Sequence, residues 1–453
     1  MLDIKFIRDN KELITLGAQK KRMDFNVDAL IEVDDKRREL LASIEKKKAE
    51  QNDVSRKIIG TPQEEKDKFV YAMQLVKNDL QKEEEKLKEV MAEWQKLMVQ
   101  VPNIPDMTVP EGESDADNQE VKTWGNIPEF SFTPKSHIEL SALHDMADFE
   151  RGTKVSGFRG YFLKNDGARL SMALWQYGME FFAARGLDPM IVPALVRRES
   201  LLGTGYLPQG EEDLYKTQDN DYLAGTGEVA TMNYYADEVL DIKDLPKKML
   251  SFSSCFRREA GSHGKDTKGL MRVHEFYKLE QVVLCEASHE ISVKYHEEIN
   301  SNTEAFIQSL GIPYHTVANC GGDLGLGQVK KYDIELWIPS EKTYREISSA
   351  SYFHDFQARR LNIRYRDAEG KMRFVHSLNC TAIPTPRSLI AIMENYQQED
   401  GSILVPEVLQ KYMGKSVIGK KNEIVPETIV EAEKTIESTT ENVTGNIDGQ
   451  DQI

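Results

Sequence analysis

The sequence has few cysteines and no long apolar run. Its four cysteines stand at positions 255, 285, 320 and 380, without a Cys-x-x-Cys pair or a His-x-x-x-His pair beside them. This spacing indicates neither a disulfide framework nor a thiolate zinc site. No apolar stretch approaches the ~20 residues of a membrane helix, and the first ten residues carry acids where a secretory signal is basic and then apolar. We therefore expect a cytoplasmic protein with no zinc and no membrane contact.

Basic side chains are also in deficit. The chain has 58 Lys and Arg against 75 Asp and Glu, a formal net charge of −17. This total argues against a nucleic-acid partner, because such binding relies on cations that contact phosphates. The distribution is uneven, however, because residues 422–453 hold eight acids, one lysine and no aromatic residue. That composition predicts a disordered acidic tail over 415–453.

Residues 28–101 predict a long helical hairpin. Their apolar residues recur at steps of three and four among dense Lys and Glu, which is the period of a helix. The break from Ile58 to Pro62 contains Gly60 and predicts the turn between two antiparallel helices. At 1.5 Å per residue, helices of about thirty residues extend about 45 Å. We therefore assign residues 1–101 to an N-terminal arm.

The first helix of this arm carries a local excess of cations. Between positions 36 and 57 there are eight basic and four acidic residues. Two interpretations remain open: a solvated helix face with i,i+4 ion pairs, or a surface that follows a phosphate backbone. We refer to these eight residues as the basic stripe. They are Lys36, Arg37, Arg38, Lys46, Lys47, Lys48, Arg56 and Lys57.

The remaining chain predicts a single α+β domain. Five prolines between positions 102 and 134 indicate a linker. From 135 to 414, helical segments such as 168–185 and 288–310 mix with β-rich runs such as 248–256 and 332–338. Short strands with hairpin-like separations favour an antiparallel sheet flanked by helices.

The segment 255–280 holds the densest set of chemically active residues. Two strand-like runs enclose a glycine- and lysine-rich loop, which predicts a β-hairpin with a cationic tip. Strand alternation groups Arg257 with Glu259, and Arg272 with Phe276 and Glu280. A guanidinium suits a phosphate, an aromatic ring offers a plane to a nucleobase, and a carboxylate can receive an ammonium. The set fits an amino acid beside ATP, whereas a surface hairpin with cross-strand ion pairs is the alternative for each residue alone.

Read in full, residues 256–280 resemble motif 2 of the seryl-tRNA synthetases, a bacterial-type family of class II aminoacyl-tRNA synthetases. Other segments agree in order. Thr226-Gly227-Glu228 resembles the serine loop of the family, residues 193–208 resemble motif 1, which carries the dimer interface, and residues 378–398 resemble motif 3. The resemblance extends from residue 1 to about 414, because the family uses such a hairpin as its tRNA-binding arm.

The resemblance implies a serine–tRNA ligase. Such an enzyme activates L-serine with ATP to seryl-adenylate and pyrophosphate, then transfers serine to the 3′ end of tRNA(Ser). Charging of selenocysteine tRNA is left open. Neither step requires an enzyme nucleophile, because positioning and charge stabilisation suffice. The alternatives are a ligase that transfers an aminoacyl-adenylate to a carrier protein and an inactive RNA-binding paralogue. The presence of the arm argues against the first, and the complete motif residues argue against the second.

The resemblance also implies roles for individual residues in a homodimer that uses ATP and Mg²⁺. Arg257, Glu259 and Arg387 are the expected catalytic residues, and we expect Glu280 to receive the serine ammonium. Cys380, Thr381 and Gly227 replace the usual Gly, Ser and Ala of the family, which retains the polar chemistry but changes the shape of the pocket. The basic stripe is the expected tRNA contact. The expected serine ligands are Thr226, Gly227, Glu228, Arg257, Glu280, Asn379 and Thr381; the ATP ligands are Arg257, Arg258, Glu259, Val273, Phe276, Glu346, Ile347, Ser348, Ser349 and Arg387; the magnesium ligands are Glu346 and Ser349.

Overall fold

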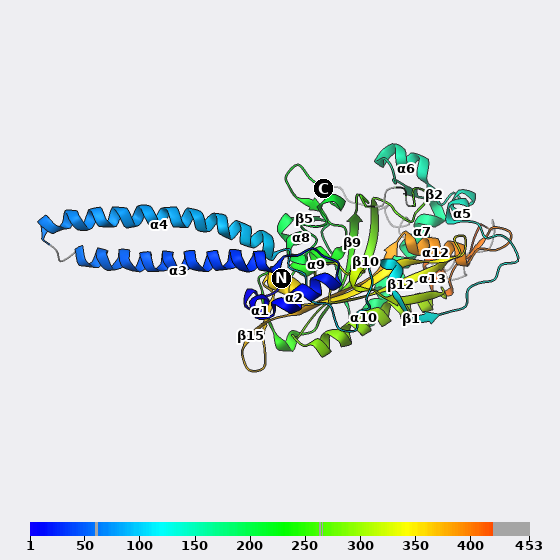
Figure 1. Ribbon diagram of the computed structural model, residues 1–453. Helices are drawn as coiled ribbons and strands as arrows, with labels where there is room; N and C mark the ends of the chain where they lie inside the picture. The colour runs from blue at the N-terminus through cyan, green and yellow to red at the C-terminus, as the bar shows by residue number, and fades with distance from the viewer. Residues whose placement is uncertain (59–61, 262–263, 265, 420–453) are drawn as a thin grey trace, which may run out of the picture.

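The computed structural model describes residues 1–58, 62–261, 264 and 266–419, which form an arm and a larger body (Figure 1). The arm consists of α3 and α4, which run antiparallel and project away from the body, while α1 and α2 lie at its base. The predicted helical hairpin is confirmed, and residues 59–61 of its turn lie outside the described residues. The bounds are α1 (Ile4–Asp9), α2 (Lys11–Lys20), α3 (Val27–Ile58) and α4 (Gln63–Met98).

The two arm helices are joined by apolar contacts at the base and by charged contacts farther out. Leu30 and Met98 are buried in one apolar cluster at the base of the arm. Beyond it, Ile44 of α3 and Leu80 of α4 are still buried, and Ser43 Oγ donates a hydrogen bond of 2.9 Å to a carboxylate oxygen of Glu83. The helical period of the sequence therefore places a narrow apolar seam between the helices and leaves most side chains in solvent.

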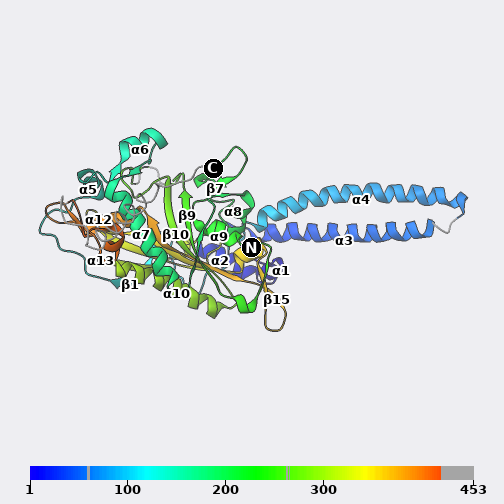
Figure 2. The same ribbon diagram turned by 180° about the vertical axis from the view of Figure 1, so that it is seen from behind.

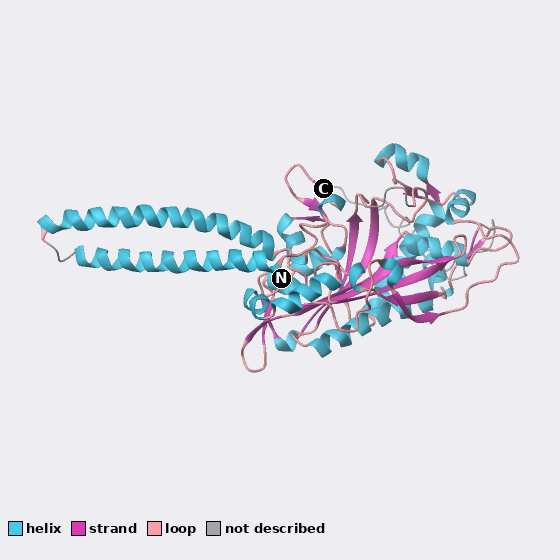
Figure 3. Cartoon of the chain, viewed as in Figure 1, coloured by secondary structure: helices cyan, strands magenta, loops and turns pink. Residues whose placement is uncertain are grey.

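The body is built on one eight-stranded sheet in the order β1-β11-β12-β13-β16-β10-β9-β4. Neighbouring strands are antiparallel except β4 and β9, which are parallel. The predicted α+β class is confirmed (Figure 3). The bounds are β1 (Gln119–Trp124), β4 (Asp188–Ile191), β9 (Lys247–Phe256), β10 (Glu275–Cys285), β11 (Tyr314–Ala318), β12 (Lys330–Ile338), β13 (Thr343–His354) and β16 (His376–Thr385).

Two segments outside the predicted catalytic domain also belong to the body. Strand β1 lies within residues 102–134, which the sequence predicted to be a linker, and pairs with β11 at the edge of the sheet. The start of the predicted tail contains β18 (Val417–Ile418), which pairs with β17 (Ile403–Leu404). Residues 420–453 of the tail lie outside the described residues.

Helices cover one face of the sheet, whereas α9 (Gly227–Asn233) and α11 (Phe356–Leu361) cover only part of the opposite face, which carries the functional residues. Helices α7 (Asn165–Ala183), α10 (His289–Ser309) and α12 (Arg387–Asn395) pack around one core cluster that includes Leu279 and Ile383 of the sheet (Figure 2). Because strand side chains alternate, the neighbours Lys278 and Glu280 of Leu279 point to the opposite face.

Two β-bulges lie in the middle of this opposite face. On β16, Leu279 faces Ile383 but Glu280 faces Thr381, so Ala382 is the extra residue. On β13, Ile334 of β12 faces Ser348 but Glu335 faces Glu346, so Ile347 is the extra residue. A bulge shifts the alternation by one residue and re-aims the side chains beyond it. The first bulge turns Thr381 to the same face as Glu280, and the second turns Glu346 to the same face as Ser349.

Candidate active site

A cavity opens on this face between the 257–273 segment, β10, β13 and the end of β16. Seven of its fourteen lining residues belong to the predicted ATP set: Arg257, Glu259, Val273, Phe276, Glu346, Ile347 and Arg387. Thr381 of the predicted serine set lines the same cavity. Residues separated by 130 positions in the sequence thus meet at one place, which supports the nucleotide site predicted from the sequence.

Arg257 and Phe276 face each other across the start of the β9–β10 hairpin. The guanidinium carbon of Arg257 lies 5.3 Å from the ring centroid of Phe276, and Arg257 Nε donates a hydrogen bond of 3.3 Å to the carbonyl of Gly225. The guanidinium is thereby tethered at one nitrogen, while an aromatic plane lies beside it. A phosphate and a nucleobase of one nucleotide can use these two groups together.

Glu259 is held by cations on two sides. Its carboxylate accepts a hydrogen bond of 3.2 Å from Arg272 Nη1 and lies 3.8 Å from Arg159 Nη1. The φ of Glu259 is +55°, in the left-handed region that non-glycine residues rarely adopt. Such strain is found where a surrounding structure fixes a functional side chain. Asp266 joins the same network, because it lies 3.1 Å from Arg272 Nε and 2.5 Å from Arg345 Nη2.

Arg387 is placed at the end of the cavity by hydrogen bonds to two carbonyls. Its Nε donates to Met271 (3.0 Å) and its Nη1 donates to Glu346 (2.8 Å). Burial lowers the pKa of this guanidinium, but an arginine side chain is not deprotonated in proteins. Arg387 also begins α12, so its charge lies beside the amino end of that helix.

Glu346 and Ser349 provide two hard oxygen donors on one face of β13. Magnesium prefers oxygen ligands, keeps several waters and is bound by one or two carboxylates together with substrate phosphates. Glu346 is exposed and lines the cavity, and Ser349 is half-buried on the same strand face, so one carboxylate and one hydroxyl are available as oxygen donors. Among the residues that the structure describes, no group of three or more His, Cys, Asp or Glu side chains could hold a metal by itself.

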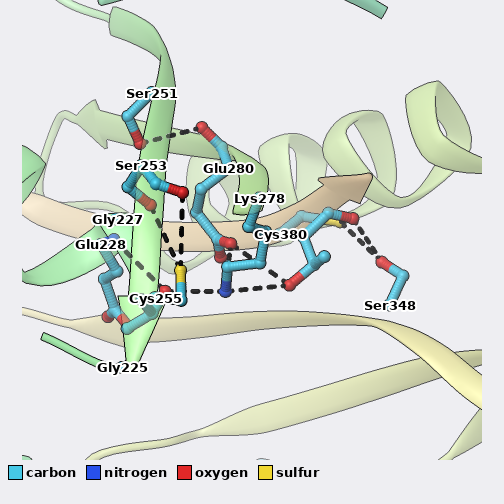
Figure 4. Close-up of polar contacts among 12 residues, drawn as sticks. Gly225, Gly227, Glu228, Ser251, Ser253, Cys255, Lys278, Glu280, Ser348 and Cys380 are labelled. Atoms are coloured by element: carbon cyan, nitrogen blue, oxygen red, sulfur yellow. Dashed lines mark hydrogen bonds and ion pairs between the residues drawn. The ribbon is translucent and has the colours of Figure 1, made fainter. Parts of the chain in front are cut away.

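A second group of predicted residues is buried just below the cavity, around Lys278. Lys278 Nζ lies 2.5 Å from Glu280 Oε2 and donates hydrogen bonds to Thr226 Oγ1 (2.7 Å) and Thr381 Oγ1 (3.3 Å) (Figure 4). Thr381 Oγ1 in turn donates to Glu280 Oε2 at 3.2 Å. All four side chains are at least nine-tenths buried. We call these four residues the serine cluster, because three of them were predicted to bind serine.

Glu228 lies beside this cluster in a different electrostatic environment. Its carboxylate accepts hydrogen bonds from Tyr206 Oη (2.8 Å) and Gln357 Nε2 (2.7 Å), both neutral donors. Burial raises the pKa of Glu228, and the negative charge of Glu280 adds to this rise. Glu228 and Asn379 line a second cavity together with Tyr206. Thr226 is the N-cap of α9 (Gly227–Asn233), so the serine loop is fixed by a helix start.

Other predicted residues lie outside the first cavity. The Ser348 hydroxyl is buried and donates to the Thr381 carbonyl at 2.5 Å, so it points to the covered side of β13. Arg258 is exposed, and its backbone nitrogen donates to the Asp213 carbonyl. The sequence analysis assigned no role to Lys278, although its place two residues before Glu280 on one strand face could have indicated it.

Two of the three substitutions relative to the usual family pattern, Gly227 and Cys380, fit their surroundings. An added Cβ at Gly227 would lie 2.7 Å from Ser251 Oγ and 2.9 Å from Ser253 Oγ, so serine hydroxyls fill the space of a methyl group. Cys380 is fully buried next to Ser348, which makes it a core thiol, and burial raises its pKa to about 12.

The basic stripe of α3 divides into paired and outward cations. Lys47 lies 3.2 Å from Glu83 and Lys48 lies 2.8 Å from Glu84, both on α4, while Arg37 pairs with Asp34 at 2.7 Å. The side chain of Lys57 lies outside the described residues. The other four are exposed and make no ion pair with another described residue; we call them the outward cations. They are Lys36, Arg38, Lys46 and Arg56.

No helix among the described residues is long and apolar enough to cross a membrane. Exposed apolar side chains instead gather near the free edge of the sheet. Met172 of α7 is 62% exposed, Ile191 of the edge strand β4 is 84% exposed, and Leu195 is 53% exposed.

Two family models match the chain. The seryl-tRNA synthetase N-terminal domain matches residues 1–105, and the tRNA synthetase class II core domain (G, H, P, S and T) matches residues 213–396. The serine–tRNA ligase of Deinococcus radiodurans is 42% identical over 422 residues, which cover 93% of this chain and 99% of that protein.

Solved structures agree with these matches. The crystal structure of seryl-tRNA synthetase from Pyrococcus horikoshii complexed with ATP superposes with a TM-score of 0.85 at 37% identity and covers 93% of this chain and all of that one. The cytoplasmic serine–tRNA ligase from Naegleria fowleri in complex with AMP gives 0.82 at 32% identity, over 93% and 99% of the two chains.

Proposed function

The chain belongs to the seryl-tRNA synthetase family, and on that premise we propose how its two cavities divide the work of a serine–tRNA ligase. The activity joins serine, ATP and tRNA(Ser) in two steps, adenylation and transfer. Its full-length similarity to such ligases, arm included, favours it over a carrier-protein ligase and over an inactive paralogue. The observation that carries the division is that the nucleotide cavity adjoins the serine cluster, because Lys278 and Thr381 of the cluster both line that cavity.

In this proposal ATP occupies the first cavity. The adenine stacks on Phe276 and contacts Glu259 at its amino edge, while Arg257 holds the α-phosphate and Arg387 the far phosphates. Two guanidiniums placed in advance at the two ends of a triphosphate stabilise the charge that develops at phosphorus. The serine carboxylate attacks that phosphorus, the bond to the β-phosphate breaks, and pyrophosphate leaves with seryl-adenylate remaining bound.

Serine occupies the space between Glu228 and the serine cluster. Arg257 reaches both its carboxylate and the α-phosphate, which aligns the two reacting groups. The sequence led us to expect that Glu280 binds the serine ammonium. Because Glu280 is already paired with Lys278, the geometry instead favours Glu228 for the ammonium. Glu280 is left to accept a hydrogen bond from the serine hydroxyl, beside Thr381 Oγ1, which donates to the same carboxylate.

Magnesium bound by Glu346 and Ser349 would neutralise part of the phosphate charge. The residues of the chain do the rest of the positioning, since the Glu346 backbone carbonyl also orients Arg387. The outward cations of the arm supply contacts for tRNA phosphates in the second step, and the shape of the arm rather than a base-reading loop selects the RNA.

Two further properties belong to the proposal. We expect a homodimer through the apolar surface of Met172, Ile191 and Leu195, and Ile191→Asp should convert the dimer to a monomer in analytical ultracentrifugation. We also assign the protein to the cytoplasm, because all four cysteines are free thiols, and thiols persist in reducing compartments.

The division of the two cavities is tested by ATP–pyrophosphate exchange with each of the twenty amino acids, followed by charging of tRNA. Serine alone should support rapid exchange. Phe276→Ala should raise the KM for ATP and leave the KM for serine unchanged. Glu228→Gln should raise the KM for serine and leave the KM for ATP unchanged. Equal effects of both variants on both substrates would contradict the assignment of the cavities.

A further inference from the structure

Lys278 is the only buried cation among the described residues of the serine cluster, and the reaction as outlined above gives it no task. Its side chain is 6% exposed and lies on β10 between Phe276, which faces ATP, and Glu280. A buried lysine is costly unless it is paired and fully hydrogen-bonded. Its presence at this place, paired and hydrogen-bonded, therefore points to a role in the organisation of the site.

The ammonium of Lys278 has three N–H donors, and three oxygen atoms of neighbouring side chains lie within reach to accept from them. The acceptors come from three different elements: Thr226 from the start of α9, Glu280 from β10 and Thr381 from β16 (Figure 4). An ammonium group carries three N–H donors, so its hydrogen-bonding capacity is used completely. One side chain thus connects three residues that are proposed to contact serine.

The two buried carboxylates nearby differ in their partners. Glu280 has a cation at 2.5 Å. Glu228 has only the neutral donors Tyr206 and Gln357 within hydrogen-bond distance, and it forms no ion pair with another described residue. Apart from Arg257, which the proposal pairs with the serine carboxylate, the site without serine holds two carboxylates and one ammonium. The ammonium of serine supplies the missing positive charge, and Glu228 is the carboxylate that lacks one.

From this balance we propose that Lys278 is a positioning residue that decides which group of serine each carboxylate binds. By neutralising Glu280 it makes that carboxylate an acceptor for the serine hydroxyl, and it leaves Glu228 as the counter-ion of the serine ammonium. The inference rests on the proposed placement of serine between these residues. It makes Lys278 a determinant of the preference for serine over alanine, although Lys278 does not take part in the chemical step.

The physical reason is that discrimination against alanine depends on a hydroxyl partner that is fixed and charged. A site built to hydrogen-bond a hydroxyl rejects the analogue that lacks it, because buried polar groups then lose their partners. Without Lys278, Glu280 is a second uncompensated carboxylate that competes for the ammonium. Serine and alanine both carry that ammonium, so the site would then recognise what the two amino acids share.

The proposal predicts a specific change in substrate preference. Lys278→Met should lower the ratio of kcat/KM for serine to that for alanine in ATP–pyrophosphate exchange by about 10- to 100-fold, the range expected for a hydrogen bond to a charged group. The KM for ATP should stay within twofold of the parent. Lys248→Met is the matched control, because Lys248 pairs with Glu298 at 2.5 Å on the far part of β9; its ratio should be unchanged.

A second variant separates positioning from mere structural support. In Lys278→Met combined with Glu280→Gln, both members of the buried ion pair become neutral, while an amide oxygen remains to accept the hydroxyl. The serine-to-alanine ratio of kcat/KM in this double variant should be at least threefold higher than in Lys278→Met. If the single variant does not fold, the double variant still tests the proposal, because its ratio must lie within tenfold of the parent's.

Several results would overturn the inference. An unchanged serine-to-alanine ratio in Lys278→Met, a parallel rise in the KM for ATP, or a double variant no better than the single one would each show that Lys278 only supports the fold. Failure of the underlying placement is distinguishable, because then Glu228→Gln would leave the KM for serine unchanged whatever Lys278→Met does.

Discussion

The substitution Gly227→Ala tests how this chain accommodates its departure from the usual family pattern. Gly227 is the first residue of α9 and stands between two proposed serine ligands, Thr226 and Glu228. An alanine methyl at this position would lie 2.7 Å from Ser251 Oγ and 2.9 Å from Ser253 Oγ. Real Cβ atoms do not approach other atoms so closely, so either the two hydroxyls or the start of α9 must move.

The contacts of the two serines set the size of the change in the free energy of unfolding. Both serines are buried, Ser251 Oγ donates to the Glu280 carbonyl at 3.4 Å, and Ser253 Oγ contacts Cys255 Sγ at 3.3 Å. Overpacking a buried site costs about 1–3 kcal/mol, whereas alanine gains about 0.5–1 kcal/mol over glycine in a helix. We therefore expect the free energy of unfolding to fall by about 1–2 kcal/mol.

The assay is urea denaturation followed by tryptophan fluorescence, together with the KM for serine in pyrophosphate exchange. The KM should rise, because a shift of a few tenths of an ångström at Gly227 also moves Glu228. Adding Ser253→Ala should restore most of the lost stability by removing one of the two hydroxyls. Gly261→Ala is the control, since its added methyl meets no atom of the described residues within 4 Å. Full stability of Gly227→Ala, or no benefit from Ser253→Ala, would refute the reasoning.

Three other predictions concern the arm, the metal and pH. Replacing the four outward cations of α3 by Gln should weaken tRNA binding and reduce the slope of log K against log salt by about 3, while ATP–pyrophosphate exchange stays unaffected. The same change at Lys47 and Lys48, which pair with α4, should weaken tRNA binding less. Equal effects would contradict the division of the basic stripe into paired and outward cations. Glu346→Gln should raise the Mg²⁺ concentration for half-maximal exchange about tenfold or more; an unchanged requirement would remove Glu346 from the metal site. Burial lowers the pKa of His296 from 6.5 to about 4. As the pH falls, the imidazole is therefore protonated in the unfolded chain before it is protonated in the folded one. The free energy of unfolding should decrease by about 3 kcal/mol in total between about pH 6.5 and pH 4. Urea titrations of His296→Gln should lack this loss relative to the parent, and parallel pH curves would show that the buried imidazole is not its source.

The fold class could be predicted because its signals are local. The helical period and the break around Gly60 predict the arm without any tertiary information. The length and charge pattern of β1 gave no comparable signal, since all but one of its residues are exposed and its pairing with β11 depends on a strand nearly two hundred residues away. Proline-rich composition therefore suggested a linker where the structure has an edge strand.

Motif 2 and its resemblance to a family also led to a set of predicted site residues, and seven of the predicted ATP ligands line one cavity. The sequence did not show the charge partners of these residues. The net charge argued against a nucleic-acid partner, because a total does not show where individual cations lie. Lys46 faces solvent, for example, whereas Lys47 and Lys48 pair with carboxylates of α4. In the same way, the sequence does not show which partners the two carboxylates have. In the structure Glu280 pairs with Lys278, whereas Glu228 accepts hydrogen bonds from the neutral Tyr206 and Gln357.

By itself, the sequence determined which chemical groups are present: guanidiniums for phosphates, an aromatic ring for a base, and carboxylates and hydroxyls for an amino acid. Only the tertiary structure decided which of them meet. Strict alternation would put Glu346 and Ser349 on opposite faces of β13, and Glu280 opposite Ala382. The extra residues Ile347 and Ala382 reverse both outcomes, because a bulge depends on the register between strands and not on the residues of either strand alone.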